Sequence, residues 1–166
     1  QRTESGSCFA SPTRGFIFGG RQQPANSTLG NIDFVTIPTL GNAHDFGDMT
    51  VTRFATQSCS NSIRGVSFAG GVSPGGKGKV IDFVTIATLG NSTNFGEMTA
   101  NRGMQHSNTD SVRGVISGGK PSDPASNVNT MEYIQIMTEG NGVDFGDLVA
   151  ATANGFDTVS TAHGGL

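Results

Sequence analysis

The chain has 166 residues, of which 25 are Gly, and charged side chains make up only 14% of it. This length suits a single domain, and the net charge of −3 argues against a nucleic-acid-binding protein. The high Gly content disfavours a helical bundle or a coiled coil, and no apolar run is long enough to cross a membrane as a helix.

A sequence pattern of about 50 residues occurs three times, which identifies a repeat protein. Each copy contains an Arg-Gly pair, a double glycine, an acidic residue followed by an aromatic residue, a Gly-Asn pair and a second aromatic residue. In copy order, the arginines are Arg14, Arg64 and Arg113, the first aromatics are Phe34, Phe83 and Tyr133, and the second aromatics are Phe46, Phe95 and Phe145. We predict one repeat domain over residues 1–166, with repeats at 14–63, 64–112 and 113–166.

The first repeat is interpreted as four short strands. Residues 14–20 are an apolar run that ends at two glycines, which is typical of a buried strand. Residues 32–37 alternate between two faces, and the Gly-Asn pair at 41–42 favours a tight turn. A further strand is expected over 49–55, so each repeat should form an antiparallel sheet of about four strands in an all-β fold.

The two ends of the chain contain parts of further repeats. Residues 7–13 match residues 58–63, which precede the second Arg-Gly pair, so residues 1–13 are a partial repeat. His163 stands where the next repeat would place its arginine. Because an exposed sheet edge carries unpaired backbone groups, we expect residues 7–13 to form a closing strand. This strand would pair with the terminal repeat of the same chain or of a neighbouring chain.

The order of these motifs resembles a kelch-type repeat. The double glycines at 19–20, 70–71 and 118–119 resemble the kelch diglycine, and Arg53 and Arg102 end a kelch-like Thr-x-x-Arg pattern. Phe replaces the kelch Trp throughout, and Thr152 stands in place of the third arginine. The repeats are similar above all to the Gly-rich kelch-like repeats of structural and tail proteins of bacteriophages, notably marine cyanophages.

The resemblance implies that each repeat is one blade of a β-propeller. Propellers have about 4–8 blades, so three blades would be completed by oligomerisation. The alternative is a closed pseudo-threefold domain similar to a β-prism or a β-trefoil.

No catalytic, metal-binding or cofactor-binding pattern is found, and we expect no enzyme activity. The Asp-Phe-Gly tripeptides at 45–47 and 144–146 lack the other kinase motifs, and the three histidines lack the spacing of metal ligands. The recurring carboxylates Asp33, Asp82 and Glu132 are interpreted as structural partners of the arginines that open the repeats. Cys8 and Cys59 stand at matching repeat positions and are expected to be buried free thiols.

The segments that follow the double glycines differ between repeats, and such variable loops on a constant scaffold are typical binding sites. The candidate binding residues are Arg21, Gln22, Gln23, Asn26, Lys77, Lys79, Lys120, Asp123 and Asn127. Asn26 and Asn91 also lie in glycosylation sequons, which matter only if the protein is secreted through a eukaryotic-type pathway.

The phage resemblance implies a virion structural or attachment module in a tail fibre, a tail knob or a head decoration. Its partners would be further copies of itself, other virion proteins and a host-surface glycan. An extracellular adhesin or glycan-binding protein, including one that assembles into filaments, is the alternative. A third function, that of a copper oxidase on a kelch propeller, would need a cluster of Tyr and His ligands. The chain contains a single tyrosine, Tyr133, which argues against this function.

Overall fold

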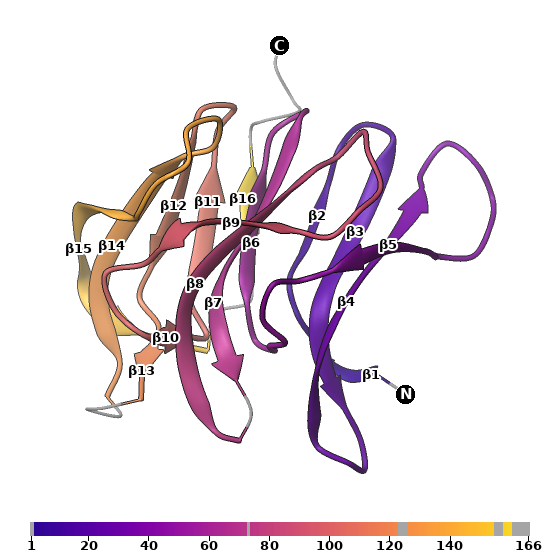
Figure 1. Ribbon diagram of the computed structural model, residues 1–166. Coiled ribbons are helices and arrows are strands. Elements are labelled where there is room, and N and C mark those ends of the chain that lie inside the picture. The colour runs from indigo at the N-terminus through magenta and orange to yellow at the C-terminus, as the bar shows by residue number, and fades with distance from the viewer. Residues whose placement is uncertain (1, 73, 123–125, 155–157, 161–166) are drawn as a thin grey trace.

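The protein folds into three mainly antiparallel sheets that stand face to face in a row, and a small two-stranded sheet accompanies them (Figure 1). The computed structural model describes residues 2–72, 74–122, 126–154 and 158–160, and within these residues all helical or strand structure is β-strand. The all-β prediction is therefore confirmed. No sheet formed by the described strands closes on itself.

Each sheet contains four consecutive antiparallel strands, and we number the sheets from the N-terminus. The first sheet is β2 (Cys8–Ala10), β3 (Arg14–Gln22), β4 (Ser27–Thr36) and β5 (His44–Asp48). The second is β6 (Gln57–Ser60), β7 (Arg64–Val72), β8 (Gly76–Thr85) and β9 (Thr93–Glu97). The third is β11 (His106–Thr109), β12 (Arg113–Ser117), β14 (Val128–Gln135) and β15 (Val143–Thr152).

Four short strands complete the fold. β1 (Arg2–Ser5) pairs with the far end of β3, and β10 (Arg102–Gly103) pairs with β13 (Lys120–Pro121). β16 (Thr158–Ser160) lies parallel to β11. The strand expected over 49–55 is not formed, since only Phe54 makes an isolated bridge there, to Gly71.

The expected closing strand is the first strand of the first sheet. β2 pairs with β3, with Cys8 opposite Ile17 and Ala10 opposite Gly15. A short turn joins β2 to β3, so the nearest available edge belongs to the same hairpin. Residues 7–13 therefore do not pair with the terminal repeat of the same chain, and each sheet begins with the strand before its Arg-Gly pair. Pairing with a neighbouring chain stays a prediction.

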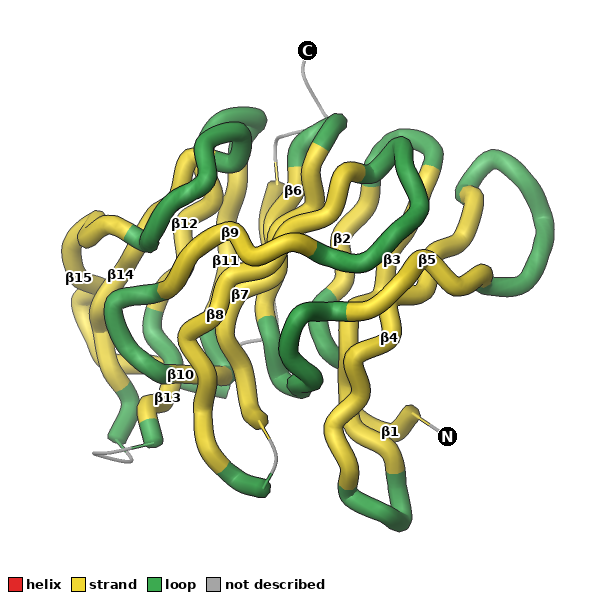
Figure 2. Tube along the Cα trace, in the orientation of Figure 1, coloured by secondary structure: helices red, strands yellow, loops and turns green. Residues whose placement is uncertain are grey.

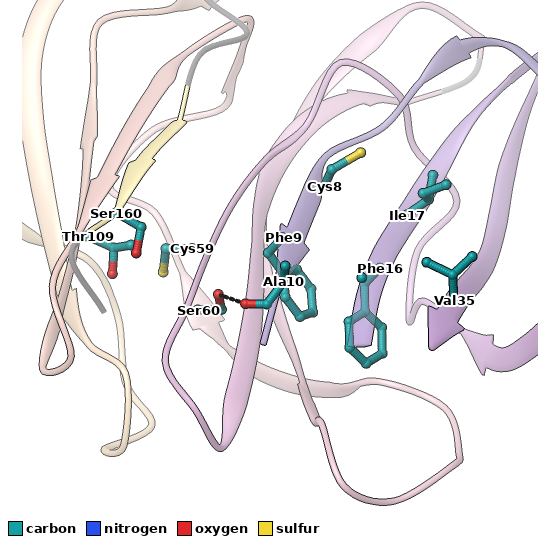
Figure 3. A pocket seen from close by; sticks show the side chains of 11 residues that line it. Cys8, Phe9, Ala10, Phe16, Ile17, Val35, Cys59, Ser60, Thr109 and Ser160 are labelled. Carbon is teal, nitrogen blue, oxygen red and sulfur yellow. Dashed lines mark hydrogen bonds between the residues drawn. The ribbon is translucent and has the colours of Figure 1, made fainter. Parts of the chain in front are cut away.

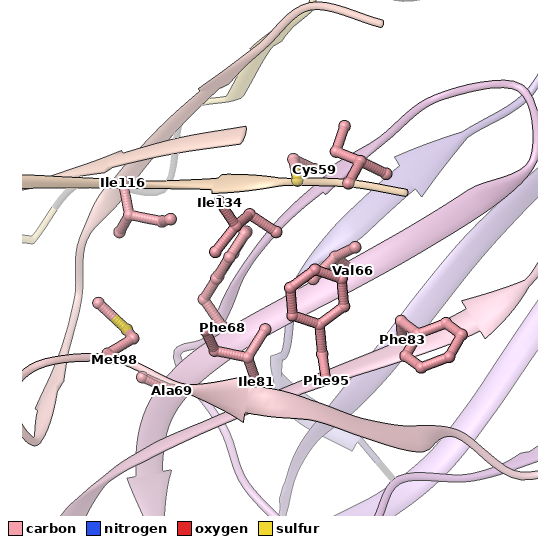
Figure 4. Close-up of a cluster of buried hydrophobic side chains, with 11 residues drawn as sticks. Cys59, Val66, Phe68, Ala69, Ile81, Phe83, Phe95, Met98, Ile116 and Ile134 are labelled. Carbon is pink, nitrogen blue, oxygen red and sulfur yellow. The ribbon is translucent and has the colours of Figure 1, made fainter. Parts of the chain in front are cut away.

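The sheets pack through two chemically different faces. Each internal core is formed by an aromatic-rich face of one sheet and an aliphatic face of the next sheet. Between the first and second sheets the core residues are Phe9, Phe16, Phe18, Ile32, Phe34, Phe46, Met49, Val84 and Ile86. Between the second and third sheets they are Cys59, Val66, Phe68, Ala69, Ile81, Phe83, Phe95, Met98, Ile116, Ile134 and Ile136 (Figure 4). We call these two surfaces of each sheet its aromatic face and its aliphatic face.

Two of the three second aromatics are buried between sheets, as the repeats predict. Phe46 is 4% exposed and Phe95 is 3% exposed. Phe145 is 49% exposed, because no described strand covers the aromatic face of the third sheet. Burial of the second aromatic therefore depends on a following sheet.

A buried ion pair links each sheet to the next. Arg53 Nη2 lies 2.8 Å from Asp82 Oδ2, and Arg102 bonds Glu132 in the same way. The Thr50 and Thr99 hydroxyls donate to the same two carboxylates. Burial lowers the pKa of Arg53, while the carboxylate of Asp82 acts in the opposite direction.

The arginines that open the repeats have a different role from the predicted one. Asp82 and Glu132 pair instead with the Thr-x-x-Arg arginines, Arg53 and Arg102. The guanidinium of Arg14 lies 4.9 Å from the ring centre of Phe34, and that of Arg64 lies 4.3 Å from Phe83. Arg14 also donates to the Ile86 carbonyl of the second sheet at 2.6 Å.

We predict that Phe95→Ala lowers the free energy of unfolding by about 3–5 kcal/mol, because it leaves a cavity between two sheets. Leu89, a large apolar residue of the same repeat that is 64% exposed, is the control. Leu89→Ala should change stability by less than about 0.5 kcal/mol, as surface substitutions do. Reversible urea melts measure both, and equal effects would contradict the packing described.

We predict that Asp82→Ala costs about 3–5 kcal/mol, because it leaves the Arg53 guanidinium buried without its carboxylate. The control is Lys79→Ala, which removes an ion pair with Glu97 whose side chains are 44% and 46% exposed. Exposed pairs contribute about 0–1 kcal/mol, so this variant should melt nearly as the wild type does. A small loss of stability in Asp82→Ala would show that the ion pair is dispensable.

Candidate functional site

The three variable loops lie at one end of the sheets, which we call the loop end. They are the turns β3–β4, β7–β8 and β13–β14, and Figure 2 shows them together at the lower edge of the molecule. Sheets that stand in register place equivalent turns side by side. The stacking thus brings together loops that are about 50 residues apart in sequence.

The candidate binding residues differ in their surroundings. Gln22, Gln23, Asn26 and Asn127 are exposed, while Arg21, Lys77, Lys79 and Lys120 are half-buried. Lys79 Nζ lies 2.7 Å from Glu97 Oε2. Asp123 lies outside the described residues.

Two of these cations contact the ring of Phe54, a residue that the sequence motifs do not include, and the charge of a third, Lys120, acts on Lys77. The Arg21 guanidinium carbon lies 3.5 Å from the centre of the Phe54 ring, and Lys77 Nζ lies 5.8 Å from it. Both distances suit cation–π contacts. Arg21 comes from the first sheet, Lys77 from the second and Lys120 from β13, so this group spans the stack. We call Arg21, Phe54, Lys77 and Lys120 the Phe54 cluster.

The diglycine motif allows Phe54 to take this position. Its backbone exchanges two hydrogen bonds with Gly71, of 3.0 and 2.7 Å. A Cβ atom at Gly71 would lie 2.4 Å from the Phe54 ring, so any side chain there would displace the ring. The double glycine that recurs in each repeat was therefore the sequence feature from which the position of Phe54 could have been predicted.

Positive charge accumulates at the Phe54 cluster in a protein that is acidic overall. The pKa of Lys77 is lowered, first by burial and then by the positive charges of Arg21 and Lys120. An anion bound beside these three side chains would relieve their repulsion. The cluster therefore favours a carboxylate or a sulfate group as ligand.

A second concave feature is an apolar groove of about 440 Å³ that is lined by residues of all three sheets (Figure 3). It is lined by Cys8, Phe9, Ala10, Gly15, Phe16, Ile17, Val35, Cys59, Ser60, Thr109 and Ser160. Most of these side chains carry no charge and few polar atoms. The groove thus suits an apolar surface better than a polar small molecule.

Neither cysteine forms a disulfide, as expected, but only one of the two is buried. Cys59 faces the third sheet and burial raises its pKa, whereas Cys8 is exposed. In the strand registers Cys8 lies opposite Ile17, as Ser58 lies opposite Ser67. The turns after β2 and β6 have the same length, so the counterpart of Cys59 is Phe9, opposite Phe16, and Cys8 stands one position earlier in its repeat. A shift of one residue moves a side chain to the other face of a strand.

We predict that a thiol reagent modifies one cysteine in the folded protein and two in the unfolded protein. Cys8 should react, and Cys59 should not, because it is buried and its raised pKa disfavours the thiolate. Counting the released chromophore of an aromatic disulfide reagent, with and without urea, measures this. Cys8→Ser should abolish the reaction of the folded protein, and a surviving reaction would contradict the assignment.

Other kinds of site are not formed by the described residues. Within them, no group of three or more His, Cys, Asp or Glu side chains could hold a metal ion. Nor does this part of the chain contain a helix that is long and apolar enough to span a membrane.

Comparison with known proteins identifies no relative. Neither the scan of protein-family models nor the search of curated proteins gives a match to this chain.

Proposed function

We propose that the protein is a non-enzymatic virion module for structure and attachment, part of a tail fibre, a tail knob or a head decoration. Its three sheets would be consecutive kelch-type propeller blades, completed by further sheets. The repeat resemblance, the row of four-stranded sheets and the constant inter-sheet contacts support this proposal. The observation that carries it is the gathering of three unlike loops, with the Phe54 cluster, at one end of a repeated scaffold.

The ligand of the loop end would be an anionic glycan on the host surface. Lys77 and Lys120 supply ammonium donors from two different sheets, and such donors form charge-assisted hydrogen bonds with carboxylate or sulfate groups. The exposed amides of Gln22, Gln23 and Asn127 surround them and suit sugar hydroxyls. Other virion proteins would hold the remaining surface of the module.

We predict that the protein binds immobilised heparin and sialylated glycans but not neutral dextran, and that added salt weakens the binding. Lys77→Ala combined with Lys120→Ala should weaken it about tenfold or more, which corresponds to about 1.4 kcal/mol. Lys79→Ala is the matched control, because its ammonium is already paired with Glu97. Equal binding by all three proteins, measured by surface plasmon resonance, would reject the Phe54 cluster as the site.

A second candidate is an extracellular adhesin or glycan-binding protein outside a virion, which the two uncovered terminal faces favour because they suit filaments. Both candidates share the glycan-binding loop end. Immunogold electron microscopy of the source material separates them, since label on particles supports the virion module and label on cell-surface filaments supports the adhesin.

A further inference from the structure

The two terminal sheets leave uncovered the two faces that pair inside the molecule. The first sheet presents its aliphatic face outward, and the third sheet presents its aromatic face outward. We propose that the aliphatic face of the first sheet binds the aromatic face of the third sheet of a second copy of this chain. This head-to-tail contact concerns assembly, and it goes beyond the proposed glycan binding at the loop end.

The outward face of the first sheet has the composition of a buried face. Ile37 is 54% exposed, whereas Ile86 and Ile136, its counterparts in the next two sheets, are 4% and 0% exposed. Ile17 and Val35 lie beside it on β3 and β4, and both line the apolar groove. Ile37, Ile17 and Val35 therefore form the surface on which a further sheet would pack.

The outward face of the third sheet is the matching surface. Phe145 is 49% exposed and packs edge-to-face on Tyr133, with 6.0 Å between ring centres. The corresponding pair in the second sheet, Phe83 and Phe95, has the same arrangement at 5.9 Å and is covered by the third sheet. Tyr133 and Phe145 therefore already have the arrangement that Phe83 and Phe95 have beneath a covering sheet.

Three hydrogen bonds recur at both internal interfaces, and the chain contains the donors and acceptors for a third set. The first bond runs from the arginine of the Arg-Gly pair to an isoleucine carbonyl: Arg14 to Ile86 at 2.6 Å and Arg64 to Ile136 at 3.4 Å. Arg113 and Ile37 are the corresponding residues of the two outward faces.

The other two bonds involve the Gly-Asn turn. Its glycine N–H donates to the carbonyl of the second aromatic, from Gly90 to Phe46 at 2.9 Å and from Gly140 to Phe95 at 2.8 Å. Its asparagine Oδ1 accepts from a backbone N–H, of Asp48 at 2.9 Å and of Glu97 at 3.0 Å. On the outward faces, Gly41 and Asn42 of one copy would meet Phe145 and Asp147 of the other in the same way.

Two internal contacts to the buried carboxylate have no counterpart at this interface. Val149 stands where Thr50 and Thr99 stand, so the hydroxyl donor is missing. Thr152 stands where Arg53 and Arg102 stand in the first two repeats, so the third sheet cannot supply the guanidinium of the buried ion pair. The contact between copies should therefore be weaker than the contacts within a copy. We expect reversible association that depends on concentration.

Two copies joined by this contact would form a ring of six sheets. The contact is heterologous, so each copy offers one aliphatic and one aromatic face, and a ring is completed when both are used. Six sheets lie within the range of about 4–8 blades found in propellers.

Analytical ultracentrifugation of the wild-type chain tests the proposal. We expect a dimer of twice the 17.1 kDa chain mass at high concentration, with dissociation on dilution. Phe145→Asp and Ile37→Asp should each abolish the dimer, because each places a charge in one of the two faces. The control is Ile63→Asp, which alters a turn residue of the second sheet that is 51% exposed, and it should leave the dimer intact.

Mixing separates this contact from one between identical faces. Phe145→Asp keeps a wild-type aliphatic face, and Ile37→Asp keeps a wild-type aromatic face, so an equimolar mixture should regain association through one interface. Far-UV circular dichroism confirms that each variant is folded, and Phe145→Ser repeats the test with a smaller change. A monomeric wild type, an oligomer insensitive to both variants, or a mixture that stays monomeric would overturn the proposal. Heparin binding by the monomeric variants reports on the loop end separately.

Discussion

Packing of an aromatic face on an aliphatic face is the interaction on which the rest of the structure depends. Each sheet has four strands, and so small a sheet is stable only when its apolar face is covered. The rings of Phe34 and Phe46 are covered by Val84 and Ile86 of the next sheet. Because the aromatic face of a sheet packs on the aliphatic face of the next sheet, all sheets in the row have the same orientation. The same directionality makes the two ends of the row different from each other.

Polar contacts fix how one sheet sits on the next. Apolar faces alone would tolerate sliding, whereas the Arg53–Asp82 pair is buried and bonds only in one register. Buried ion pairs contribute little net stability but penalise arrangements that separate their partners. Thr50 and the Gly-Asn turn add further bonds at the same interface. The repeated set of contacts therefore specifies a constant geometry between sheets.

Constant geometry also explains the position of the candidate site. The loops after the double glycines are free to vary, because the contacts between sheets are made elsewhere. Lys77 and Lys120 come from different repeats, and only the stacking brings Lys120 close enough to add to the effect of burial and of Arg21, which lower the pKa of Lys77. Phe54 belongs to the link between two sheets and holds Arg21 against its ring. A binding surface built in this way can change its ligand without a change in the scaffold.

The sequence by itself determined the repeats, the all-β class and the two strands that flank each double glycine and acidic-aromatic motif, because these follow from local alternation and from glycine and asparagine turns. It misplaced the last strand of the first sheet, which spans His44–Asp48 and not residues 49–55. It also indicated that the loops differ while the scaffold is constant. It could not determine which faces meet. Cys59 is buried because the third sheet covers its face of the second sheet, whereas no described strand covers the face of the first sheet that carries Cys8 or the face of the third sheet that carries Phe145. The partner of Asp82 and the Phe54 cluster were likewise decided by tertiary structure, because contacts across sheets join residues whose separation in sequence carries no periodic signal.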